Sequence, residues 1–260
     1  MKRLALVAAF AAAGSVAPVR AAEPGAIVVF AAASLREAFD AAAPAFTKKT
    51  GVGVSFSYGG SDTLVTQLKQ GAPGDVFASA NEAQMKVAVD GGLLTTSPRP
   101  FARNRLVVVV PKDNPAKISA LADLAKPGVR VVLAASNVPV GDYARTAFRR
   151  LNGQPGFPAD FGGFVERNVV SNELDVKAVA TKVSLGEGDA GVVYATDATA
   201  PALAGRVRII AFPPGTSPEA VYPIAALKSS SNPAGARAFV DFMLSPAGQA
   251  FLRARGFVSP

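Results

Sequence analysis

The chain has 260 residues, half of them hydrophobic and 18% charged, and its formal net charge is +8. This length and composition exclude a disordered polymer and predict one large or two smaller globular domains. The chain contains no cysteine and no histidine, which excludes disulfides, thiol nucleophiles, histidine-ligated zinc and Ser-His-Asp catalysis.

The first 21 residues have the pattern of a secretory signal peptide. Lys2 and Arg3 precede an apolar stretch, and the small residues around Arg20, ending at Ala21, are typical of a cleavage site. Cleavage there removes three basic residues and lowers the net charge from +8 to +5, with the remaining Lys and Arg scattered along the chain. We therefore expect a secreted protein without a lipid anchor, and we do not expect nucleic acid as a partner.

From residue 25 onward, short apolar runs alternate with amphipathic stretches. The alternation predicts strands at residues 26–31, 53–58 and 74–80 and helices at residues 34–50, 61–71 and 81–92. This strand–helix order is typical of a parallel sheet covered by helices. Pro44 predicts a break or kink within the first helix.

A second set of elements follows residue 104. We expect strands at residues 105–111, 129–136, 190–195, 206–212 and 221–228 and helices at 138–151, 175–188, 233–245 and 246–256. The segment 152–164 is rich in Gly, Pro and aromatic residues and is predicted to be a loop. The order favours an α/β protein of two lobes, with lobe I formed by residues 22–104 and 213–260 and lobe II by residues 105–212.

Two helix starts in the first lobe follow small residues. Ser34 comes after three alanines, and Glu37 three residues later completes the pattern of a capping box. Ser61 follows Gly59 and Gly60, which permit close approach of the backbone to a ligand. A helix N-terminus presents free N–H groups with partial positive charge, so both turns have the chemistry of an anion site. Each turn alone is explained as well by ordinary capping.

The second lobe offers similar positions. Pro139 fits the first position of a helix, which leaves the N–H groups of Val140 and Gly141 free. A helix beginning near Glu173 places the N–H of Val176 in or near its first turn. Tyr194 ends a predicted strand, at the edge where ligands bind in open α/β sheets.

Together these residues predict a cleft between two lobes that is lined by hydroxyl and N–H groups. Such a site suits a fully deprotonated anion, because donors alone leave a protonated anion without an acceptor. Asp62, Asp142 and Asp175 lie beside these positions in the sequence and would repel an anion unless they point away.

Four stretches carry a family resemblance: "VFAAASL", "SDTLVTQLKQGAPGDVFASA", "VPVGDYA" and "DVKAVATKVSLGEGDAGVVYATDA". On these residues the chain resembles the substrate-binding proteins of bacterial molybdate ABC transporters, over nearly all of residues 27–260. Asp62 stands where a small neutral residue is common in that family, Val140 stands where alanine is frequent, and the span 149–168 is longer than in compact members.

The resemblance implies a monomeric, two-lobed type II periplasmic binding protein that captures molybdate or tungstate and delivers it to a membrane permease. It implies hydroxyl contacts from Ser34, Ser61 and Tyr194. It implies backbone N–H contacts from Ser34, Ser61, Val140 and Val176. These residues contact the oxygens of the anion and do not ligate the metal atom directly. The implied protein resides in the periplasm, catalyses no reaction and holds no cofactor, since molybdate or tungstate is its cargo.

Three alternatives remain open at this point. The same class of protein could bind sulfate, thiosulfate or another tetrahedral oxyanion. A secreted enzyme using carboxylates such as Asp142 and Asp175 would need those groups to converge in the cleft. A ligand-dependent protein that presents one lobe to a sensor would have the same sequence pattern.

Overall fold

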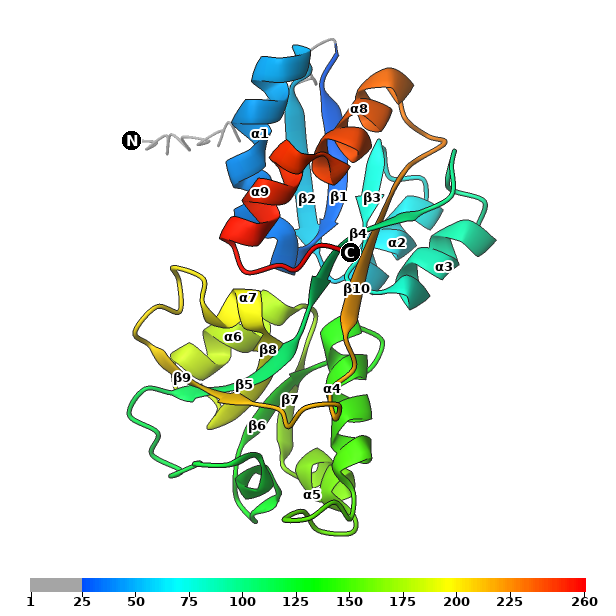
Figure 1. The fold of residues 1–260 in the computed structure, drawn as a ribbon. Coiled ribbons are helices and arrows are strands. Elements are labelled where there is room, and N and C mark those ends of the chain that lie inside the picture. The colour runs from blue at the N-terminus through cyan, green and yellow to red at the C-terminus, as the bar shows by residue number, and fades with distance from the viewer. Residues whose placement is uncertain (1–24) are drawn as a thin grey trace, which may run out of the picture.

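The computed structural model describes residues 25–260, so the predicted signal peptide, residues 1–21, lies outside the described residues. Two five-stranded sheets form two lobes (Figure 1). The strand order is β2-β1-β3-β10-β4 in lobe I and β7-β6-β8-β5-β9 in lobe II. The strands are β1 (Ile27–Ala32), β2 (Val54–Gly59), β3 (Val76–Ala78), β4 (Arg99–Asn104), β5 (Leu106–Pro111), β6 (Val131–Ala134), β7 (Val169–Glu173), β8 (Ala190–Tyr194), β9 (Val207–Ala211) and β10 (Ala220–Ala226).

Helices cover both faces of the lobe I sheet (Figure 1). The helices are α1 (Arg36–Thr50), α2 (Ser61–Lys69), α3 (Glu82–Asp90), α4 (Pro139–Leu151), α5 (Phe161–Arg167), α6 (Val176–Ser184), α7 (Ala195–Ala198), α8 (Pro233–Leu244) and α9 (Pro246–Ala254), with 3₁₀ turns η1 (Ala33–Leu35) and η2 (Leu121–Ala125). In lobe I, α1, α8 and α9 pack together, and α2 packs with α3. Successive side chains of β1 point to opposite faces of the sheet. Val29 packs into the main core, and Phe30 packs into a smaller core with residues of α2 and α3.

Each sheet is mixed rather than purely parallel. In lobe I, β1 is parallel to β2 and β3, as predicted, whereas β10 is antiparallel to both β3 and β4. Lobe II repeats this scheme, with β6 parallel to β7 and β8 and with β5 antiparallel to β8 and β9. The chain crosses between lobes from β4 to β5 and again from β9 to β10 (Figure 1). The returning C-terminal segment therefore completes lobe I.

Two expectations about local structure are wrong. The helix α1 continues through Pro44, because this proline is exposed and the apolar face with Phe39 and Phe46 is fully buried. The expected loop 152–164 contains the start of α5, where Asp160 caps the helix and Phe161 is buried. Burial of one aromatic side chain and a cap outweigh the low helix propensity of the two glycines that follow Phe161.

The sequence did not predict the strands β4 and β7. Their side chains do not alternate strongly in hydrophobicity, and both strands lie at sheet edges. Only pairing with β10 and β6 identifies them as strands. Within residues 25–260, no helix has the length and hydrophobicity needed to cross a bilayer.

Substitution of Phe39 tests the packing that holds α1 against the lobe I sheet. It is fully buried, and its ring centroid lies 5.5 to 5.9 Å from those of Phe56, Phe101 and Phe239. We expect Phe39→Ala to lower the free energy of unfolding by about 3–5 kcal/mol, as measured by urea denaturation. The control Phe164→Ala truncates a side chain that is 40% exposed and should cost less than about 1 kcal/mol. Equal losses in the two variants would contradict this account of the core.

Candidate functional site

A small hollow lies where the two lobes meet. It encloses about 210 Å³ of empty space, counting the part that opens to solvent. Its walls combine the turns after β1, β2 and β3 with the turns after β6, β7 and β8. All five residues singled out from the sequence line it: Ser34, Ser61, Val140, Val176 and Tyr194. The carboxyl ends of parallel strands therefore face each other across the cleft, as expected for a ligand site in α/β folds.

Three helices begin at the hollow. Ser61 is the first residue of α2, Val140 is the second residue of α4, and Val176 is the first residue of α6. The first turn of a helix leaves its N–H groups without intrahelical acceptors. No side chain caps α2 or α4, so their free N–H groups are available to an anion. The helix containing Val176 begins three residues later than expected, because β7 extends to Glu173.

Glycine allows close packing at two of these turns. A Cβ on Gly141 would lie 2.1 Å from the carbonyl oxygen of Ala135, so only glycine permits α4 to begin directly against the end of β6. A Cβ on Gly60 would lie 2.4 Å from the carbonyl oxygen of Leu174 in the other lobe. Gly60 therefore allows the two lobes to approach each other beside the hollow.

Three buried hydroxyl groups face this region. The amide N–H of Ala80 donates to Ser61 Oγ at 3.0 Å. Ser34 Oγ lies 3.0 Å from the hydroxyl of Tyr222. Among the described residues, the hydroxyl of Tyr194 has no hydrogen-bond partner although it is fully buried. Burial raises the pKa of Tyr194 well above its usual value, so the phenol remains a donor at neutral pH.

The capping box expected at Ser34 does not form. Ser34 lies within η1, and no side chain caps this turn or α1. Its hydroxyl instead contacts Tyr222, and Glu37 instead forms an ion pair with Lys177. The simple structural explanation for Ser34 is therefore wrong.

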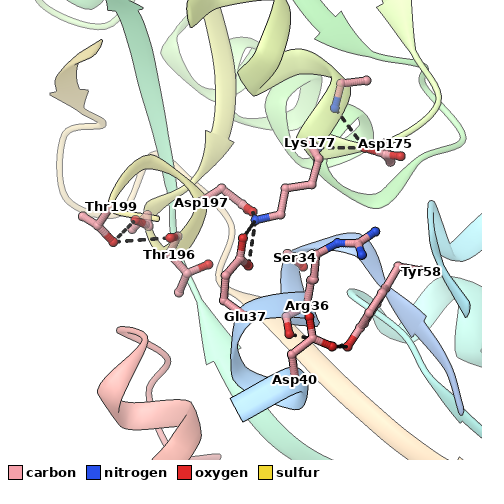
Figure 2. Close-up of polar contacts among 12 residues, drawn as sticks. Ser34, Arg36, Glu37, Asp40, Tyr58, Asp175, Lys177, Thr196, Asp197 and Thr199 are labelled. Carbon is pink, nitrogen blue, oxygen red and sulfur yellow. Dashed lines mark hydrogen bonds and ion pairs between the residues drawn. The ribbon is translucent and has the colours of Figure 1, made fainter. Parts of the chain in front are cut away.

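The three aspartates noted in the sequence do not converge in the hollow. Asp142 is exposed. Asp175 lines the hollow, but its Oδ1 caps α6 by accepting from the N–H groups of Lys177 and Ala178 at 2.7 and 3.0 Å (Figure 2). This cap leaves the N–H of Val176 free. Within residues 25–260, no cluster of three or more Asp, Glu, His or Cys could hold a metal ion.

Asn137 joins the lobes on the α2 side of the hollow. Its Nδ2 donates to Asp62 Oδ2 at 2.7 Å, and its carbonyl oxygen accepts from Gln84 Nε2 at 3.0 Å. Asp62 stands where a small neutral residue is common in the family that the sequence resembles. One of its two carboxylate oxygens thus makes a contact between the lobes. No sequence signal marks this contact, because its partner is 75 positions away.

Lys177 also joins the two lobes (Figure 2). Its Nζ lies 2.7 and 2.8 Å from the two carboxylate oxygens of Glu37 in lobe I. It also lies 2.8 Å from Asp197 Oδ1 in lobe II. The contact with Asp197 is an ion pair without hydrogen-bond alignment, since neither carboxylate oxygen of Asp197 has a hydrogen-bond partner among the described residues.

Burial opposes charge on both Lys177 and Asp197, with different outcomes. Burial alone would lower the pKa of Lys177, but Asp197 and Glu37 outweigh it, so the lysine pKa is raised and the cation persists. Burial raises the pKa of Asp197 to about 6, and Lys177 only partly offsets this effect. The ion pair between lobes is therefore charged at neutral pH, with Lys177 shared by two carboxylates.

The sequence and fold identify the family to which the chain belongs. Residues 27–258 match the bacterial extracellular solute-binding proteins. The chain is also 43% identical over 235 residues to the molybdate-binding protein ModA of Mycobacterium tuberculosis, covering 90% of this chain and 85% of that protein. The chain belongs to this solute-binding family. Its members are binding components of transport rather than enzymes, which agrees with the expectation that the chain catalyses no reaction.

Two solved structures share the two-lobed fold of this solute-binding protein. One is the periplasmic molybdate-binding protein of Azotobacter vinelandii, with 24% identity, a TM-score of 0.74 and coverage of 90% of this chain and 99% of that chain. The other is the sulfate-binding protein SubI of M. tuberculosis, with 24% identity, a TM-score of 0.78 and coverage of 90% and 86%. The fold predicted from the sequence is confirmed, and it does not distinguish the two anions.

The raised pKa of Asp197 predicts a specific pH dependence of stability. Between its usual pKa of 3.8 and about 6, the native state holds a proton that the unfolded state has lost, so stability falls as pH rises through this window. We expect the difference in unfolding free energy between wild type and Asp197→Asn to fall by about 2 kcal/mol from pH 4 to pH 7.

Urea denaturation of both proteins at each pH measures this difference. Asp241→Asn, which changes an aspartate whose side chain is 70% exposed, is the matched control for the substitution itself. A difference between wild type and Asp197→Asn that stays constant across the window would show that Asp197 ionises normally.

Proposed function

We propose that the protein captures molybdate, and also tungstate, in the hollow between its lobes and delivers it to the membrane permease of an ABC transporter. The observation that carries the proposal is the hollow itself. It combines buried hydroxyl groups and free helix N-termini with no lysine or arginine among its described lining residues. The names of the relatives support molybdate as the anion.

In this proposal, Ser34, Ser61 and Tyr194 donate from their hydroxyl groups. Ser34, Ser61, Val140 and Val176 donate from their backbone N–H groups. About seven charge-assisted hydrogen bonds of roughly 2 kcal/mol each amount to about 14 kcal/mol before the costs of desolvation and ordering. A dissociation constant between about micromolar and nanomolar follows.

The contacts of Asn137 and Lys177 between the lobes support closure over the anion. Asn137 adjoins the lining residue Val138, and Lys177 adjoins the lining residue Val176. A closed hollow excludes water, which strengthens hydrogen bonds to a charged ligand. We assign residues 22–104 and 213–260 to lobe I and residues 105–212 to lobe II, because the two crossings lie at those boundaries.

The remaining parts of the proposal concern location and partners. Removal of residues 1–21 would leave a monomer free in the periplasm, without a lipid anchor, and the permease would be its protein partner. The extracellular character of the family supports this location. Sulfate and thiosulfate remain the alternative ligands, since a sulfate-binding protein has the same fold.

Isothermal titration of the mature, anion-stripped protein at neutral pH tests the ligand. We expect one-to-one binding of molybdate and tungstate, with sulfate and phosphate much weaker. Sulfate binding as tight as that of molybdate would overturn the ligand assignment and leave the solute-binding class intact. No binding of any of the four anions would show that the hollow is not a site for oxyanions.

Removal of the Ser61 hydroxyl tests whether the proposed residues form the binding site. Removal of one charge-assisted hydrogen bond costs about 2 kcal/mol, so Ser61→Ala should weaken molybdate binding about 30-fold. Ser34→Ala should act in the same direction. Ser55→Ala, at an exposed position on β2, is the matched control and should leave affinity unchanged. Wild-type affinity in a folded Ser61→Ala variant would remove Ser61 from the site.

A further inference from the structure

Tyr222 lies behind Ser34 and does not line the hollow. It belongs to β10, in the returning C-terminal segment, and its side chain is fully buried. Its hydroxyl oxygen lies 3.0 Å from Ser34 Oγ, although 188 positions separate the two residues. The Tyr222 hydroxyl therefore contacts the site through the side chain of Ser34, and the Tyr222 ring packs against the lining residue Tyr194.

Close packing surrounds the side chain of Tyr222. The pairing of β10 with β4 shifts register between Tyr222 and Pro223, and such irregularities re-aim side chains near functional sites. The Tyr222 ring packs edge-on against Phe257 at 5.4 Å and against Tyr194 at 5.8 Å between ring centroids. The hydroxyl is thus held toward Ser34 by its packing.

The direction of this hydrogen bond follows from counting donors and acceptors. Ser34 Oγ is the aligned hydrogen-bond partner of the Tyr222 hydroxyl, and the Asn104 amide and the Tyr194 hydroxyl also lie near it. If Ser34 donated to Tyr222, the buried Tyr222 proton would have no aligned acceptor among the described residues, because the Asn104 amide approaches as a donor and the Tyr194 hydroxyl makes no hydrogen bond. A buried proton without an acceptor is costly. If Tyr222 donates to Ser34, the Ser34 proton is free to reach an anion in the hollow. Burial raises the pKa of Tyr222 well above its usual value, so its proton is retained.

Ser61 shows the same arrangement with no ambiguity. Its Oγ accepts from the N–H of Ala80, and an amide N–H can only donate. The Ser61 proton must therefore point elsewhere, and Ser61 lines the hollow. Both serines then receive a hydrogen bond from the protein and have one proton left to donate.

We propose that Tyr222 is a positioning residue that fixes Ser34 as a donor to the bound anion and thereby favours fully deprotonated oxyanions over singly protonated ones. The inference rests on the proposed function, because it assumes that an oxyanion occupies the hollow. Molybdate and sulfate carry no proton at neutral pH, whereas hydrogen phosphate carries one. Without the Tyr222 hydroxyl, Ser34 Oγ can rotate and accept that proton.

Tyr222→Phe tests the inference, since it removes one oxygen and keeps the ring. We expect molybdate affinity, measured by isothermal titration, to fall about 3- to 10-fold. We expect hydrogen phosphate, measured by its competition with molybdate at pH 8, to gain at least about 3-fold relative to molybdate. Tyr58→Phe is the matched control, because the Tyr58 hydroxyl donates to Asp40 (Figure 2) and Tyr58 does not line the hollow.

A double-mutant cycle separates positioning from a general structural effect. If Tyr222 acts through Ser34, then Tyr222→Phe should change molybdate affinity less than 2-fold in a Ser34→Ala background. Near-ultraviolet circular dichroism checks that each variant retains its fold.

The outcomes distinguish this inference from the proposed function. A wild-type protein that binds no molybdate would overturn the proposed function itself. Wild-type binding combined with an equal effect of Tyr222→Phe in both backgrounds would overturn the positioning role. A variant whose preference for molybdate over hydrogen phosphate is unchanged, or that shows no phosphate competition, would overturn the role in selectivity.

Discussion

The hollow depends on one geometric constraint, which is that the carboxyl ends of strands from two separate sheets face each other. A site without a cation must gather many N–H and O–H donors at one point, because each supplies only part of a charge. In the proposed site, the turns after β1 and β2 would supply donors from one lobe, and those after β6 and β7 would supply donors from the other. Two chain crossings, from β4 to β5 and from β9 to β10, connect the sheets that carry these turns (Figure 1).

Close backbone approach is the second requirement of such a site. Gly141 allows α4 to start against the end of β6, and Gly60 allows the lobes to approach each other. A side chain at either position would separate the donors that must converge on a single ligand. The alanines before Ser34 have a similar role, because Ala32 and Ala33 line the hollow without filling it.

The charged side chains of Asp62, Asp175 and Lys177 beside the hollow already have partners within the protein. Asp175 caps α6, and Asp62 accepts from Asn137. Lys177 follows Val176 directly, yet it is occupied by Glu37 and Asp197 (Figure 2). Recognition of an anion therefore rests on the direction of hydrogen bonds rather than on a neighbouring cation, and hydroxyl orientation becomes a determinant of selectivity.

The sequence by itself determined the α/β class, most helices and strands, and five of the residues that line the hollow. Hydrophobic periodicity and small residues at helix starts are local signals, so they can be read without the fold. Only the tertiary structure decided the strand β4, the antiparallel pairing of the predicted strand β10, the ion pair of Glu37 with Lys177, and the contact of Tyr222 with Ser34. Glu37 had the spacing of a capping box, and nothing near Tyr222 in the sequence marks it. Their roles are set by partners 140 and 188 positions away, and contacts at such separations exist only once the two lobes have packed together.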